Sequence, residues 1–260
     1  MPSILLFDFL LFDFDFDFKD FNFNDMDIPP HLLNGHYGDR YFDVVDALEE
    51  AKRIHIGNSR VIERLAAMPD GQRRIRIGET GFGAGRLLVA LMDSLGEGGV
   101  TGAAIDYDSV ELHPITAERM GLILGGFRDR AGRHIDRLTD AYSRLDISEP
   151  GWHECAISGS FGVVNLRLFV GEALDMAASM VEPRDAWFLD GHSPKKNPDI
   201  WRGELLSAIG AKTAPGGTAT TFTVAGHVRR NLAAAGFSVE KVPGFGGKKE
   251  ALLGILRGSC

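Results

Sequence analysis

A glycine-rich loop, residues 79–86, is the first stretch of this 260-residue chain whose residue types suit chemistry. It reads Glu-Thr-Gly-Phe-Gly-Ala-Gly-Arg and follows a short apolar run. Glycines let the backbone turn tightly and approach a ligand, and N–H groups at the start of a following helix attract anions. A dinucleotide fingerprint needs a glycine where Arg86 stands, so the NAD pattern is not met. A tight turn without a ligand remains the alternative.

Carboxylates follow two other apolar runs. Asp190 ends the apolar run in FLDGHSPKKNP, residues 188–198, where the chain breaks into a loop. A nucleoside ligand also needs an acid about 20 residues beyond the glycines, where it can bind the ribose hydroxyls. Asp106, Asp108 and Glu111 are all near that position, and spacing does not choose among them. Asp190 would either face a ligand or cap its own loop.

These residues need strands and helices to position them, and the chain alternates the two from residue 75 onward. Repeated alternation with short loops predicts an α/β fold with a doubly wound, mostly parallel sheet. The last two strands are expected to form an antiparallel hairpin at one edge. Ligands of such sheets bind outside the carboxyl ends of the strands. The expected strands cover residues 75–79, 100–110, two runs within 153–170, 186–190, 216–223, 237–242 and 250–257, and the expected helices cover 86–96, 115–127, 171–180, 198–212 and 225–236.

Composition limits the classes to consider. With 44% hydrophobic and 25% charged residues, the chain has the composition of a globular protein. Its two cysteines, Cys155 and Cys260, indicate neither a disulfide framework nor a metal cluster and favour a reducing cytoplasm. The apolar first residues lack a basic leader, and no apolar run is long enough to cross a membrane.

Charge and composition divide the chain into three expected parts. Residues 1–33 form an acidic, aromatic, low-complexity leader, residues 34–70 an N-terminal segment, and residues 71–260 the main domain. The overall charge is -8, which argues against a nucleic-acid partner. The C-terminal region from residue 195 is nevertheless basic, so it could meet a phosphate backbone, or simply be a solvated surface.

Longer motifs resemble one family. The acid-x-Gly-x-Gly-x-Gly spacing from Glu79 is similar to the first motif of S-adenosylmethionine-dependent methyltransferases. Beyond it, the chain resembles the methyltransferase domain of the MnmC type, bacterial tRNA enzymes that form 5-methylaminomethyl-2-thiouridine. The stretches that carry this resemblance are residues 77–85, 109–116, 185–201 and 221–254, with a fainter one at 46–58.

The resemblance implies a Rossmann-like class I fold, S-adenosyl-L-methionine as cofactor, and roles for particular residues. Glu111 matches the acid that takes the ribose, and Glu172 the acid that meets the adenine. Asp190 would face the transferable methyl group as the catalytic residue, where positioning of the amine matters more than proton removal. No metal is implied, and with no second nucleotide fingerprint before Cys260 the family's flavin oxidoreductase domain is not expected. The implied cofactor-binding residues are Glu79, Gly81, Phe82, Gly83, Gly85, Glu111, Glu172 and Asp190.

The implied substrate is the aminomethyl group of a wobble uridine in the anticodon loop of tRNA. Trp201 and Phe245 would stack on a base or simply pack. The family reads Asp-Gly-Phe-Ala-Pro where this chain reads Asp-Gly-His-Ser-Pro, with His192 and Ser193 as the differences. The family also usually has Phe at the position of His227. A small amine or metabolite is therefore an alternative substrate. A non-catalytic domain that acts as a protein partner is a third possibility. The implied substrate-binding residues are His192, Lys195, Lys196, Arg229, Arg230, Lys248 and Lys249.

Overall fold

A computed structural model describes residues 29–42 and 46–258 of the chain. Most of the acidic, aromatic leader predicted over residues 1–33 therefore lies outside the described residues. The division into parts at residues 34 and 71 stays a prediction. Within the described part, the helices from Ala47 to Ala66 pack on the same core as the helix over Arg86–Glu97.

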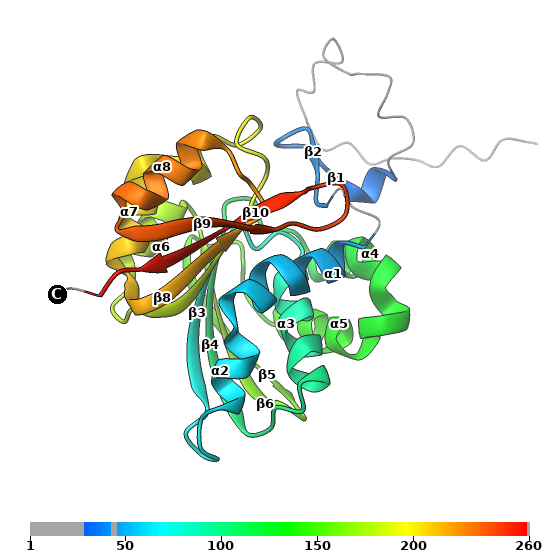
Figure 1. Cartoon of the computed structure of the whole chain (residues 1–260). Coiled ribbons are helices and arrows are strands. Elements are labelled where there is room, and N and C mark those ends of the chain that lie inside the picture. The colour runs from blue at the N-terminus through cyan, green and yellow to red at the C-terminus, as the bar shows by residue number, and fades with distance from the viewer. Residues whose placement is uncertain (1–28, 43–45, 259–260) are drawn as a thin grey trace, which may run out of the picture.

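An eight-stranded sheet forms the centre of the molecule (Figure 1), with the order β5-β6-β4-β3-β7-β8-β10-β9. The five strands from β6 to β8 are parallel, whereas β5, at one edge, runs antiparallel to β6. At the other edge β10 pairs antiparallel with both β8 and β9, so the predicted C-terminal hairpin is confirmed. The strands are β3 (Arg74–Thr80), β4 (Ala103–Glu111), β5 (Gly151–Gly159), β6 (Gly162–Val170), β7 (Arg184–Leu189), β8 (Thr213–Thr221), β9 (Phe237–Pro243) and β10 (Glu250–Leu256).

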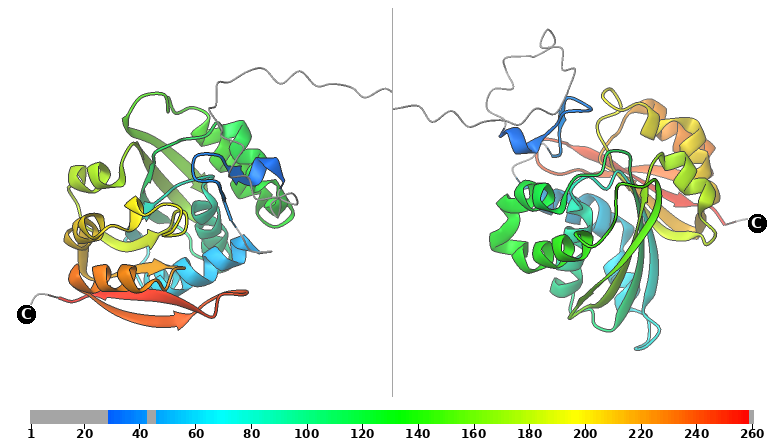
Figure 2. Two further views of the ribbon diagram at one scale, coloured as in Figure 1. Left: turned by 90° about the horizontal axis from the view of Figure 1, so that it is seen from above. Right: turned by 180° about the vertical axis from the view of Figure 1, so that it is seen from behind.

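Helices cover both faces of this sheet, as the views in Figures 1 and 2 show. One face carries α1, η4, α3 and α5, and the other carries α6, α7 and α8. A short hairpin of β1 (Leu33–Asn34) and β2 (Asp39–Arg40) stands apart from the main sheet. The helices are η3 (Pro30–Leu32), α1 (Ala47–Ala51), η4 (Lys52–Gly57), α2 (Val61–Ala66), α3 (Arg86–Glu97), α4 (Ala117–Ile123), η5 (Leu124–Phe127), α5 (Arg128–Tyr142), α6 (Ala173–Ser179), η6 (Asp199–Trp201), α7 (Gly203–Ala211) and α8 (Gly226–Ala234).

Burial on both faces explains the apolar runs of the parallel strands. Trp187 and Phe188 are neighbours in β7, and both are fully buried. Because side chains alternate along a strand, Phe188 enters the core under α3 and Trp187 the core under α7. Strands covered on both sides read as continuous apolar segments rather than as alternating ones. The predicted doubly wound fold is therefore confirmed.

Two helical predictions were wrong in detail, and one helix was not predicted. The helix expected over residues 115–127 ends as α4 at Ile123 and tightens into η5, where two glycines weaken the helical conformation. The helix expected over residues 198–212 is interrupted at Arg202, whose ψ of 150° is extended. Helix α5 was not predicted, because its many charged residues hide a narrow apolar stripe that includes Ile135 and Leu138.

None of the helices in the described ranges is long and apolar enough to span a membrane. Within those ranges, no group of His, Cys, Asp and Glu side chains is arranged to hold a metal ion. Cys155, in β5, is a free thiol whose pKa is raised by burial to about 11.

Candidate active site

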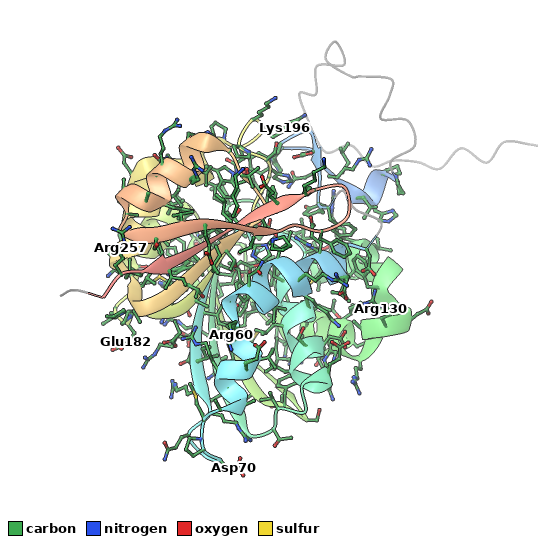
Figure 3. All side chains as sticks on the ribbon, viewed as in Figure 1. Arg60, Asp70, Arg130, Glu182, Lys196 and Arg257 are labelled. Carbon is green, nitrogen blue, oxygen red and sulfur yellow. The ribbon has the colours of Figure 1, made fainter. Side chains whose placement is uncertain are left out.

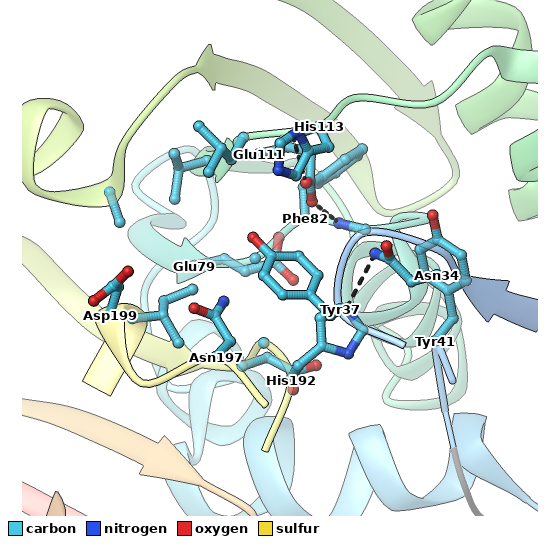
Figure 4. Close-up of a pocket in the computed structure, with 18 of the residues that line it drawn as sticks. Asn34, Tyr37, Tyr41, Glu79, Phe82, Glu111, His113, His192, Asn197 and Asp199 are labelled. Atoms are coloured by element: carbon cyan, nitrogen blue, oxygen red, sulfur yellow. Dashed lines mark hydrogen bonds between the residues drawn. The ribbon is translucent and has the colours of Figure 1, made fainter. Parts of the chain in front are cut away.

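A pocket opens at the carboxyl ends of the parallel strands. It encloses about 1150 Å³, part of which is open to solvent, and is lined by the loops after β3, β4, β6 and β7 and by the β1–β2 hairpin. The chain runs outward from β3 to β4 and β6, then returns to the other side of β3 as β7. A reversal of this kind opens a crevice in doubly wound sheets, which is where their ligands bind. Figure 4 shows the side chains that surround this pocket.

The glycine-rich loop after β3 forms the floor of the pocket. Gly81, Gly83 and Gly85 have φ angles of 78°, 55° and 73°, a region that favours glycine over other residues. A Cβ added to Gly81 would lie 3.0 Å from Cα of Gly191, so the loop packs directly on the backbone that follows β7. These glycines therefore bring two strand ends together at the pocket.

Phe82 lies within the same loop and lines the pocket, but its ring also belongs to the core. It is 2% exposed and packs on Tyr142 with a centroid distance of 5.9 Å and an interplanar angle of 14°. Its N–H donates to the carbonyl of Val110 at 2.8 Å. Phe82 thus fixes the loop against β4, in addition to any contact with a ligand.

Glu79, the last acid of β3, is a buried carboxyl at the pocket wall. Ser109 Oγ donates to its Oε2 at 2.6 Å. Its Oε1 has no hydrogen-bond partner among the described residues, although the Tyr107 hydroxyl lies near enough to interact with the carboxyl. Burial raises the pKa of Glu79 well above its usual value. A positively charged ligand beside this carboxyl would stabilise its ionised form.

Glu111 is the acid at the end of β4 that reaches the pocket. Its Oε2 accepts from the N–H of Gly83 at 2.8 Å and its Oε1 from the N–H of His113 at 3.0 Å (Figure 4). Each carboxylate oxygen keeps a second lone pair that can accept a hydroxyl. Asp106 and Asp108 do not line the pocket, since each is paired with arginine elsewhere on the sheet. The geometry thus favours Glu111 among the three acids that spacing left open.

Two further acids line the pocket, one from the loop after β6 and one from the loop after β7. Glu172 immediately precedes α6 without a capping bond from its side chain, and its half-exposed carboxylate is 4.0 Å from the guanidinium of Arg202. Asp190 follows β7, and its Oδ2 accepts from Arg86 Nη2 at 2.9 Å. The side chain of Asp190 therefore pairs with a buried cation and does not cap its own loop.

The β1–β2 hairpin, residues 33–40, covers the pocket and is held by His192. Nε2 of His192 lies 3.1 Å from Nδ2 of Asn34, and its Nδ1 lies 3.4 Å from Asp39. Burial disfavours the charged form of Asp39, but the bond and charge of His192 outweigh it and lower the pKa of Asp39. The Tyr37 ring lies 4.5 Å from the His192 ring. The structure thus brings His192 to the pocket as a partner of the hairpin.

Tyr37 projects from this hairpin into the pocket (Figure 4). Burial, followed by the negative charges of Glu111, Glu172 and Asp199, raises the pKa of Tyr37. Its hydroxyl therefore faces the acidic lining, and the hairpin forms one wall of the site.

The six predicted basic substrate residues fall into two groups. Lys196 Nζ donates to the carbonyl of Gly38 at 3.0 Å, and Lys248 Nζ to Glu50 at 3.2 Å. Lys196 lies at the same end of the molecule as the hairpin, far from Asp70 (Figure 3). The structure leaves the remaining four on the exposed surface, and these are Lys195, Arg229, Arg230 and Lys249.

The two aromatic candidates also differ. Trp201 is 1% exposed, donates from Nε1 to the carbonyl of His192 at 2.9 Å and packs edge-on against Phe222. It is therefore a packing residue. Phe245 is half-buried under the guanidinium of Arg53, at 5.3 Å.

Sequence reasoning missed the hairpin residues and Arg86. Asn34 and Tyr37 occur in a short polar stretch whose spacing gives no signal for a lid over a distant loop. Arg86 did carry a signal, because it is a charged residue at the start of an otherwise apolar helical run.

The family comparison agrees with this geometry. Residues 142–257 match the model of a family described as S-adenosyl-L-methionine-dependent methyltransferases. A solved structure titled as MnmC2 from Aquifex aeolicus has the same fold, with a TM-score of 0.69 and 21% identity over 87% of this chain and 67% of that one.

Curated relatives are more similar in sequence. The protein of Ectopseudomonas mendocina is 37% identical over 85% of this chain, and that of Caulobacter vibrioides 39% identical over 83%. Both are named tRNA 5-methylaminomethyl-2-thiouridine biosynthesis bifunctional protein MnmC. The matches cover 33% and 35% of these relatives, so the chain spans about a third of their length.

Proposed function

Because the chain is a methyltransferase domain of the MnmC type, dependent on S-adenosyl-L-methionine, we propose that it methylates the aminomethyl group of a modified wobble uridine in tRNA. The observation that carries this proposal is the meeting of the glycine loop, Glu111 and Asp190 in one pocket at the sheet's carboxyl end. In this proposal the glycine loop and Glu111 would hold the cofactor, and Asp190 would orient the amine.

The acids of the pocket fit S-adenosylmethionine. This cofactor carries a positively charged sulfur, an ammonium group and two ribose hydroxyls. Glu79, Glu111, Glu172 and Asp190 all line the pocket and offer carboxyl oxygens, and a cation beside Glu79 would stabilise its ionised form. In the proposed arrangement Glu111 would hold the ribose, Glu172 the adenine amino group, and Glu79 the methionine end beside the glycine loop.

When bound, S-adenosylmethionine supplies a methyl group that an amine lone pair takes, while the carbon–sulfur bond breaks and its electrons stay on sulfur. The product ammonium then releases a proton. The chain's own task is to hold the unprotonated amine in line with the methyl carbon and to keep water out. Asp190 would orient the amine through a hydrogen bond, and the hairpin with Tyr37 would close the site.

A tRNA acceptor is supported by the relatives' names and by the surface. Lys195, Arg229, Arg230 and Lys249 are exposed cations that suit phosphate contacts. A wobble base would have to leave its stack to reach the pocket. His192 and Lys196 would then act on the substrate indirectly, through the hairpin that they hold. A tRNA substrate would also place the enzyme in the cytoplasm.

Transfer of labelled methyl groups tests the proposal. The purified chain is incubated with methyl-labelled cofactor and tRNA that lacks the last methyl group, and the tRNA is digested to nucleosides. We expect label in a single wobble nucleoside, and a much slower gain of label with Asp190→Asn. Label in small amines but not in tRNA would instead support a metabolite methyltransferase. Absence of cofactor binding in calorimetry would support a non-catalytic domain.

A further inference from the structure

Arg86 is a buried cation that the chemistry above does not use. It is the first residue of α3, and residues 87–92 after it are all apolar and buried. Only 9% of Arg86 is exposed, and it lines the pocket. A buried guanidinium is tolerated when its N–H groups are paired, so its partners indicate its role.

Helix α1 holds one side of this guanidinium. Nη1 of Arg86 donates to the carbonyl of Ala47 at 2.7 Å and lies 3.6 Å from Glu50 Oε2. Glu50 is buried too, and its Oε1 accepts from Lys248. A planar guanidinium anchored at one nitrogen presents the other in a defined direction. That second nitrogen, Nη2, is the one that donates to Asp190 at 2.9 Å.

The backbone of Asp190 is held independently of Arg86. Thr80 Oγ1 donates to the Asp190 carbonyl at 2.9 Å. The next residue, Gly191, has a φ of 131° and packs against Gly81. The remaining freedom of Asp190 is rotation of its carboxylate, and the bond from Arg86 to Oδ2 restricts that rotation. The other oxygen, Oδ1, has no hydrogen-bond partner among the described residues.

We propose that Arg86 is a positioning residue for methyl transfer: it holds Oδ2 of Asp190, so that Oδ1 faces the pocket and accepts an N–H of the amine that receives the methyl group. The identity of that amine rests on the proposed function. The orientation of the carboxylate depends on this chain alone, and can be tested without any acceptor.

Two cofactor analogues report on that orientation. S-adenosylhomocysteine has a neutral sulfur where the methyl group would be attached, whereas sinefungin carries an ammonium group there. A carboxylate held toward this position should favour sinefungin, since charge-assisted hydrogen bonds are the stronger ones. Calorimetry on the full wild-type chain should show a preference for sinefungin of about tenfold.

Arg86→Met should lose most of this preference while its Kd for S-adenosylhomocysteine stays within about threefold of wild type. Asp190→Asn should show the same pattern. Arg86→Lys keeps the charge but lacks the planar fork, and should recover part of the preference. Arg184→Met is the matched control, because it breaks a different buried pair, with Asp108, away from the pocket.

Two outcomes would overturn the proposal. If Arg86→Met kept the preference that Asp190→Asn lost, Asp190 would not need Arg86. If Arg86→Met weakened both analogues equally, or behaved as Arg184→Met does, Arg86 would bind the cofactor or serve the fold alone. If tRNA gained no label but the analogues bound as predicted, tRNA would be ruled out as the methyl acceptor. The proposed role of Arg86 would still hold.

Discussion

Among the residues that the structure describes, two buried arginine–aspartate pairs lie at this sheet, and one of them is at the pocket. Arg86 meets Asp190 beyond the carboxyl end of β7, and Arg184 meets Asp108 between β7 and β4. The Arg184–Asp108 pair is sealed, with side chains 3% and 0% exposed, against 10% and 15% for Arg86 and Asp190. Burial of charge is thus common to both sites and does not by itself identify the functional one.

The difference lies in the second oxygen of each aspartate. Oδ1 of Asp108 is buried without a hydrogen-bond partner among the described residues, and burial raises the pKa of Asp108 despite Arg184 and Arg167. Asp190 lines a cavity, so its second oxygen can meet a ligand. A buried pair becomes useful for chemistry when one partner keeps an atom open to the pocket.

Replacing each of the two aspartates by asparagine, in separate variants, should distinguish these roles. Of the changes considered, this one should have the largest effect. Asp190→Asn should lower kcat by about 10² to 10⁴-fold, because the amine loses its anionic partner, while affinity for S-adenosylhomocysteine changes little. Asp108→Asn should instead lower the free energy of unfolding by about 3 kcal/mol, since it leaves Arg184 uncompensated, with kcat per folded molecule unchanged. Methyl-transfer kinetics and urea unfolding measure the two. Full activity of Asp190→Asn would remove Asp190 from the mechanism.

Glu79 offers a contrast to both pairs, because no arginine in the described part of the chain bonds to this buried acid. Its raised pKa means that the folded state keeps a proton that the unfolded state loses, so stability should fall as pH rises above the ordinary Glu value. Within that window the fall is about 1.4 kcal/mol per pH unit. Glu79→Gln should remove this part of the fall, as urea unfolding between pH 5 and pH 8 would reveal. Identical pH profiles of variant and wild type would contradict a raised pKa.

The contrast between pocket and core also explains what sequence could predict. The glycine spacing and the acid after β7 identified the pocket, because strand ends and tight turns are local features. Glu111 was chosen over Asp106 and Asp108 by resemblance, since all three lie near one strand end. Only the folded structure shows that Asp106 and Asp108 pair with arginines away from the pocket.

Contacts between distant segments could not be predicted. The bond between Asn34 and His192 joins residues 158 positions apart, and that between Arg86 and Asp190 joins residues 104 apart. No periodic pattern in the sequence indicates either contact. The prediction that His192 binds substrate therefore did not include its contacts with the hairpin, and His192 also lines the pocket.

The hairpin should respond to loss of its histidine with a smaller effect. His192→Ala removes the contacts to Asn34, Asp39 and Tyr37, so residues 33–40 should exchange amide hydrogens faster. Affinity for S-adenosylhomocysteine should fall about fivefold, in keeping with the loss of about one net hydrogen bond. His227→Ala, at an exposed position, is the control. Unchanged exchange in the hairpin would show that other contacts hold it.

Among the basic residues, too, some charges are paired within the protein and others are exposed. Substitutions of these residues should have the smallest effects of those considered. Lys249 is exposed, whereas Lys248 pairs with Glu50 and lies 4.6 Å from the Phe222 ring. If Lys249 contacts a phosphate, Lys249→Ala should weaken tRNA binding a few-fold and reduce the slope of log affinity against log salt by about 1. Lys248→Ala should leave that slope unchanged, because its ammonium is already committed to Glu50. A slope lost with Lys248 but not with Lys249 would mean that tRNA displaces Glu50, and that paired charges on this surface are available after all.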